Sequence, residues 1–171
     1  MITWTISEGH RGRRWREVRT DRGDAVVSSL LLETDTAGRF LHAELSTPAG
    51  LLTLHPEGDG TLHGNVVTGD GVHHVTGLPW SDEAMLVVEG SSLALAAVVH
   101  ALGRRVSAGR RLDVAVAHVS LGLSVNLGTI TVERLAEDSW RVAGGSVGVD
   151  ADGLPAFPAG DSWPLEREWQ A

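Results

Sequence analysis

The chain has 171 residues, 42% of them hydrophobic, and its mean hydropathy of +0.00 excludes both a disordered chain and one that lies mostly in a membrane. It contains no cysteine, which excludes disulfides, thiol nucleophiles and thiolate-bound metal centres, and no lysine, which excludes a Schiff-base lysine. The net charge of -8 argues against a nucleic-acid partner, because such a partner requires a clustered positive surface.

The length fits one domain, so we expect residues 1–171 to form a single unit, either as a monomer or as a homodimer. The N-terminal segment reaches charged residues within a few positions and lacks the apolar core of a secretory signal. No apolar run approaches the roughly 20 residues that span a bilayer. We therefore expect a soluble cytoplasmic protein with no membrane span.

Short apolar stretches recur along the chain with Gly, Asp and Pro between them. They are residues 2–6, 25–33, 40–45, 51–55, 61–67, 72–77, 84–90, 112–121, 129–135, 139–144 and 146–152. Many strands at this spacing, without an alternation of strands and helices, are typical of an antiparallel sandwich or barrel. Glycines inside these stretches, at Gly64, Gly122 and Gly148, indicate a strongly bent sheet. The prediction is an all-β fold, a strongly curved antiparallel sheet that forms an open or closed barrel.

One segment, residues 91–103, fits helix rules instead. It is rich in Ala and Leu, begins with serines that can cap a helix, and ends at Gly103. A buried strand remains an alternative, because a short continuous apolar run has the same periodicity signal in either structure. We expect at most one substantial helix, at this position.

Three histidines and an asparagine surround a tight turn in the segment 63–75. The sequence "TGDG" at 68–71 predicts a two-residue hairpin loop, which pairs residue 67 with 72, 65 with 74 and 63 with 76. Because side chains alternate along a strand, His63, Asn65, His74 and Thr76 then share one face.

This polar face has two interpretations: an ordinary solvent-facing surface, or the polar lining of a ligand cavity. A metal site is not expected, because no tight metal-binding spacing is present, and no cofactor motif is found. Since histidine titrates near neutrality, His63 and His74 are candidates for proton transfer. The carboxylate of Asp82, close to Trp80, is a third candidate.

The C-terminal third of the chain carries a set of motifs. Val132-Glu133-Arg134 and Trp140-Arg141-Val142 occupy two strand-like stretches, and "VDADGL" at 149–154 is followed by Phe157-Pro158. These motifs resemble the last strands of a bacterial glycolipid-binding family, in which Tyr-Pro stands in place of Phe157-Pro158. Upstream the chain departs from that family, because its "DVDL" and "TNTLP" elements are missing.

The resemblance implies an open barrel similar to bacterial lipoprotein carriers, with a cavity for a lipid-like or glycolipid-like molecule. The first functional hypothesis is therefore the binding of a hydrophobic or amphipathic small molecule. Its predicted contacts are His63, Asn65, His74, Trp80, Arg134 and Trp140. The second hypothesis is an isomerase or cyclase acting on a hydrophobic metabolite, with proton transfer by His63, His74 or Asp82. A third is a structural domain with a filled core and no ligand.

Overall fold

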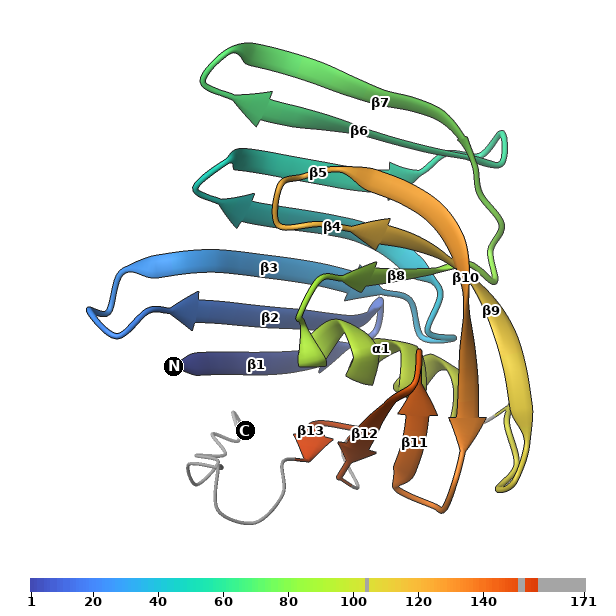
Figure 1. Ribbon diagram of the computed structural model, residues 1–171. Helices are drawn as coiled ribbons and strands as arrows, with labels where there is room; N and C mark the ends of the chain where they lie inside the picture. The colour runs from blue at the N-terminus through green and yellow to red at the C-terminus, as the bar shows by residue number, and fades with distance from the viewer. Residues whose placement is uncertain (104, 151–152, 157–171) are drawn as a thin grey trace.

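A computed structural model of the protein describes residues 1–103, 105–150 and 153–156. Most of the chain forms two β-sheets, and one helix lies inside the curl of the second sheet (Figure 1). The first sheet has seven antiparallel strands in chain order. They are β1 (Ile2–Gly9), β2 (Gly12–Thr20), β3 (Val26–Thr34), β4 (Phe40–Thr47), β5 (Gly50–Pro56), β6 (Thr61–Thr68) and β7 (Gly71–Pro79).

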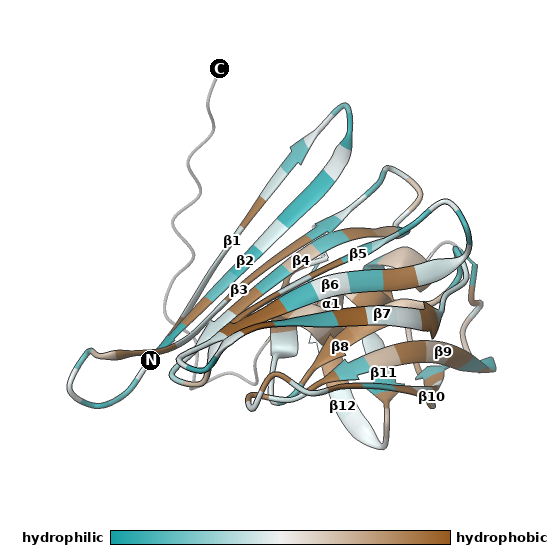
Figure 2. Ribbon diagram, turned by 90° about the horizontal axis from the view of Figure 1, so that it is seen from above, coloured by the Kyte–Doolittle hydropathy of each residue, from teal (hydrophilic) through white to brown (hydrophobic). Residues whose placement is uncertain are grey.

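The strands of the seven-stranded sheet alternate between buried and more exposed residues, as expected for a sheet with one face on the core. Figure 2 shows this alternation of hydrophobic and hydrophilic residues along the strands. The buried face carries the leucines Leu30, Leu32, Leu45, Leu52 and Leu54. The opposite face is directed away from the rest of the protein.

The second sheet has six strands in the order β13-β12-β11-β10-β9-β8 and curls around the helix (Figure 1). They are β8 (Met85–Val88), β9 (Arg111–Val119), β10 (Val125–Arg134), β11 (Ser139–Val142), β12 (Gly145–Val149) and β13 (Pro155–Ala156). Four of its five pairings are antiparallel, whereas β8 and β9 are parallel and joined through the helix. This strand–helix–strand unit is a feature that the strand pattern did not predict.

The helix α1 (Ser92–Leu102) confirms the prediction for residues 91–103 and removes the buried-strand alternative. Ser91 caps it, because its hydroxyl accepts a hydrogen bond from the backbone N–H of Ala94. A helix that is apolar on nearly all sides is stable only when it is buried. Accordingly, Leu93 and Ala97 face one hydrophobic core while Val98 and Val99 face another.

These two cores hold the layers together. The first lies between the sheets and includes Leu52 and Leu54 from the seven-stranded sheet and Leu86 and Val119 from the curled sheet. The second fills the curl between α1 and strands β8–β12, and it contains the fully buried Trp140. The prediction of a mostly β, strongly curved fold with one helix is confirmed, and the structure divides it into two sheets.

Close approaches explain two of the three glycines that the sequence places inside strands. A Cβ atom added at Gly64 would overlap the carbonyl oxygen of Thr53 on β5, so the bent sheet admits only glycine there. Gly148 similarly approaches Ala156. Gly122 lies in the turn between β9 and β10 rather than inside a strand. Among the described residues, no helix has the length and apolar character needed to span a membrane.

Candidate functional site

The predicted histidine hairpin forms with most of its predicted register. Val67 pairs with Val72, and Asn65 pairs with His74. Beyond these pairs a β-bulge shifts the register between Leu62 and Gly64, so His63 lies opposite two residues, 76 and 77, instead of Thr76 alone.

The polar face of this hairpin is the outer face of the seven-stranded sheet. The side chains of Leu62, Val66 and Val75 point to the core, so His63, Asn65 and His74 point away from it. The Nδ1 atom of His74 lies 2.7 Å from Oδ1 of Asn65, and this hydrogen bond is exposed to solvent.

Two further predicted site residues, Trp80 and Asp82, follow the hairpin in the chain, and one of them is buried while the other is exposed. Trp80 is buried in the core between the sheets, where its ring packs edge-to-face on Phe40 at 5.4 Å between ring centroids. Asp82 is highly exposed, and its carboxylate lies 3.5 Å from the guanidinium of Arg39. Trp80 and Asp82 are therefore near in sequence but sit in different environments.

Arg134 and Trp140 form a structural contact in the curled sheet. The guanidinium of Arg134 lies 5.3 Å from the ring centroid of the buried Trp140. It donates hydrogen bonds to the carbonyl oxygens of Gly103, at 3.2 Å, and Val106, at 3.0 Å. Two more bonds reach carbonyls in the β10–β11 turn. Arg134 thereby ties the end of α1 to this hairpin.

The six predicted ligand contacts are thus not assembled into one site. Three share the outer face of the first sheet, while Trp80 and Trp140 belong to separate hydrophobic cores. The motif residues Ala151, Asp152, Phe157 and Pro158 lie outside the described residues. Within the described part of the chain, no three histidine or carboxylate side chains are grouped so that they could hold a metal ion.

The space between the two sheets is filled by side chains. The gap there is lined by Leu30, Leu45, Leu52, Leu54 and their neighbours, and it has no room for a water molecule. A ligand in this space would have to push packed leucines apart.

A cavity of about 300 Å³ lies on the other face of the curled sheet, beside the first turn of α1. Its walls come from four separate parts of the chain: residues 87–92 with Leu95, His118 on β9, Ile130 on β10, and Ala143 in the β11–β12 turn. The lining is mainly apolar, and the cavity is open to solvent. We refer to this space as the α1 cavity.

Three polar side chains of the α1 cavity have unused hydrogen-bonding capacity. The hydroxyl oxygen of Ser92 is buried and has no hydrogen-bond partner among the described residues. The imidazole of His118 packs over Gly128 on β10. A Cβ atom added at Gly128 would lie 3.4 Å from Cδ2 of this ring, so the glycine leaves room for the imidazole. Glu89 accepts a hydrogen bond from the N–H of Leu121 at 3.0 Å through one of its two oxygens.

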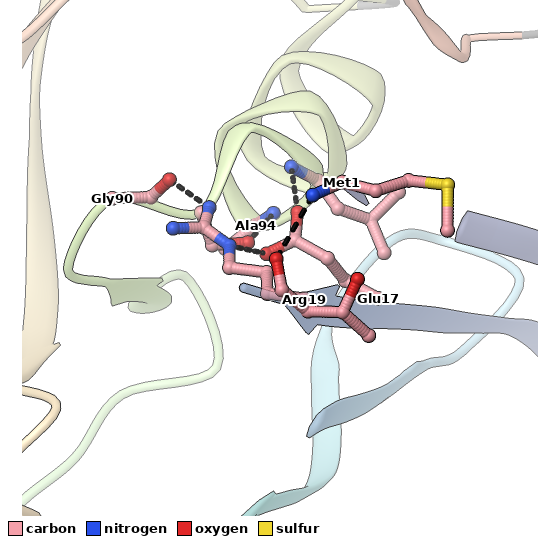
Figure 3. A network of polar contacts seen from close by, with 8 residues as sticks. Met1, Glu17, Arg19, Gly90 and Ala94 are labelled. Atoms are coloured by element: carbon pink, nitrogen blue, oxygen red, sulfur yellow. Dashed lines mark hydrogen bonds and ion pairs between the residues drawn. The ribbon is translucent and has the colours of Figure 1, made fainter. Parts of the chain in front are cut away.

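A network of polar contacts joins strand β2 to the loop before α1 and to the start of the helix, which form part of the cavity wall (Figure 3). The carboxylate of Glu17, which is only 3% exposed, accepts hydrogen bonds from Nε of Arg19 at 2.8 Å and from the N–H of Leu93 at 3.3 Å. Arg19 also donates to the carbonyl oxygen of Gly90. Glu17 and Arg19 thereby hold the loop before α1 against strand β2.

The residues of the α1 cavity were not predicted as site residues. His118 interrupts the apolar second half of β9, on the same side as Val114 and Val116, which pack against the helix. Because this side of β9 faces the helix, the polar side chain of His118 is the sequence signal that could have indicated a gap in the packing between β9 and α1. Ser92 had been assigned only to helix capping, which Ser91 performs.

Comparison with known proteins supports the fold alone. No protein-family model matches the chain, and no curated protein matches it. The chain is similar to the crystal structure of a DUF1089 family protein from Pseudomonas aeruginosa, with a TM-score of 0.65 and 15% identity over 96% of this chain and 92% of that one. The expectation of a glycolipid-binding family in particular stays a prediction.

Proposed function

We propose that the protein binds a small hydrophobic or amphipathic molecule in the α1 cavity. The observation that carries the proposal is the combination, in one cavity of about 300 Å³, of mainly apolar walls with the polar residues Glu89, Ser92 and His118 among those that line it. Small-molecule sites have this character, with a mostly apolar lining and a few polar groups that orient the ligand, and volumes from about 300 Å³ upward.

The two ends of such a ligand have distinct places. Val87, Leu95 and Ile130 offer an apolar surface, whose burial by a ligand is favourable at about 25 cal/mol per Å². His118, which is exposed, offers hydrogen bonds to the polar end. Binding here needs no rearrangement of the packed leucines between the sheets.

A cavity-filling substitution tests the proposal with the neutral hydrophobic dye Nile red. We expect saturable dye binding by the wild-type protein and at least a tenfold loss of affinity in Leu95→Trp, because the larger side chain fills the α1 cavity. The matched control is Leu127→Trp, at an exposed position on the opposite face of β10. It should bind the dye within about twofold of wild type. No saturable binding by wild type, or equal binding by Leu95→Trp, contradicts the proposal.

An isomerase or cyclase remains the second candidate, favoured by one observation: the imidazole of His118 and the carboxylate of Glu89 line the same cavity. In this case compounds that bind the wild-type protein would be converted to products that mass spectrometry detects. His118→Gln should then lower turnover by roughly 100-fold or more while the variant still binds the dye saturably. Full turnover in His118→Gln would contradict a catalytic role of this histidine.

A further inference from the structure

We infer that the ligand of the α1 cavity has a polar end that donates hydrogen bonds and carries no negative charge, namely an amine or a hydroxyl group. The inference rests on the proposed function, since it concerns the ligand of the same cavity. It follows from the hydrogen bonds that the N-terminal N–H groups of α1 already make and from the polar side chains that line the cavity.

The N-terminus of a helix ordinarily attracts anions, because its first N–H groups lack partners and the helix dipole is positive there. In α1 two of these donors, the N–H groups of Leu93 and Ala94, already have acceptors. The carboxylate of Glu17 accepts the N–H of Leu93, and the hydroxyl of Ser91 accepts the N–H of Ala94 at 3.0 Å. Arg19 on β2, which contacts Gly90 in the wall of the cavity, is occupied by Glu17 and the carbonyl oxygen of Gly90. An anionic ligand would therefore find few donors at this end of the cavity.

The open groups of the cavity favour a donor instead. Glu89 uses one carboxylate oxygen for the N–H of Leu121, and its other oxygen makes no hydrogen bond with a described residue. No arginine is among the described residues that line the cavity, so Glu89 gives it a negative potential. The Ser92 hydroxyl can either accept or donate a hydrogen bond, so it does not distinguish between the two kinds of polar end. An ammonium or hydroxyl group can donate a hydrogen bond to the free oxygen of Glu89, whereas a carboxylate would be repelled by it.

Three probes with one chain length test the inference: octylamine, octanol and octanoate, measured by displacement of Nile red at neutral pH. We expect octylamine and octanol to bind at least fivefold more tightly than octanoate. Glu89→Gln keeps an oxygen for the N–H of Leu121 but removes the charge, so it should reduce the preference for octylamine over octanoate by about fivefold, the size of a solvent-exposed charge interaction. Glu83→Gln is the matched control, because Glu83 is exposed and does not line the cavity, and it should leave the preference unchanged.

The outcomes separate the inference from the proposed function. If wild type binds Nile red and Leu95→Trp does not, the cavity is a binding site whatever the probes show. If octanoate is then the tightest of the three probes, the inference about the polar end is overturned and the proposed function stands. An equal effect of Glu83→Gln and Glu89→Gln also overturns the inference, because the preference would then reflect net charge. If neither the dye nor any probe binds wild type, the proposed function itself fails.

Discussion

Glu17 stabilises the fold and also holds the loop that forms part of the α1 cavity. Two substitutions of Glu17 should lower the free energy of unfolding by different amounts. In Glu17→Gln the amide oxygen can still accept the N–H of Leu93, but the charged bond to Arg19 is lost. In Glu17→Leu both bonds are lost, so the N–H of Leu93 stays buried without an acceptor. The second variant should therefore be the less stable of the two.

The magnitudes follow from burial. A hydrogen bond to a charged group contributes roughly 1.5–3 kcal/mol, and Arg19 is 20% exposed on its side of the pair, so we expect Glu17→Gln to lose about 1.5 kcal/mol. An unsatisfied buried N–H costs about 1–3 kcal/mol more, so Glu17→Leu should lose about 3 kcal/mol. Glu33→Gln removes a charge from the Arg14–Glu33 ion pair at 2.6 Å, in which Arg14 is 62% exposed, and it should lose less than about 1 kcal/mol.

Urea unfolding followed by tryptophan fluorescence measures these differences, and the dye assay adds a second readout. We expect Glu17→Leu to weaken Nile red binding as well, because the loop before α1 loses its attachment to β2. The reasoning is refuted if Glu17→Leu is as stable as Glu17→Gln, or if Glu33→Gln is destabilised as much as either.

Three further predictions concern positions outside the cavity. Burial opposes ionisation of Asp35, but hydrogen bonds from the backbone and side chain of Arg39 outweigh it and lower the pKa of this carboxyl below its ordinary 3.8. The stability advantage of wild type over Asp35→Asn should thus be fully present above about pH 5 and decline as pH falls through the lowered pKa; an advantage that grows below pH 4 in urea unfolding contradicts this. Gly38→Ala should lose about 2 kcal/mol or more, because φ is +83° and the new Cβ would lie 2.7 Å from α1, and a melting temperature equal to wild type argues against it. His74→Ala and Asn65→Ala should each change the free energy of unfolding by less than about 0.5 kcal/mol and leave dye binding intact. A tenfold loss of dye affinity in either variant would instead indicate that the ligand binds on the outer face of the seven-stranded sheet.

Local chemistry made part of this structure predictable. The helix followed from a capping serine, an Ala-rich and Leu-rich run and a terminal Gly103. The hairpin register followed from the two-residue loop at Gly69-Asp70, because a tight turn fixes which residues of its two strands face each other. Its limit was the bulge opposite His63, which depends on the bending of the whole sheet.

The α1 cavity could not be predicted in the same way. Ser92, His118, Ile130 and Ala143 are far apart in the chain, and the crossover from β8 through α1 to β9 brings them together. The histidine hairpin was the more conspicuous cluster because its members are near in sequence. The opposite face of this hairpin, which includes Val66, packs on the core. This packing leaves the polar face in solvent, and it cannot be predicted from the hairpin sequence alone.

The most direct test of the α1 cavity as the ligand site is a two-dimensional 1H–15N NMR titration of the full chain with octylamine. The account predicts saturable shifts of backbone amide signals at Gly90, Ser92 and His118, with Asn65 and His74 on the outer sheet face unchanged. Shifts confined to Asn65, His74 and their neighbours, or no saturable shifts at all, would contradict it.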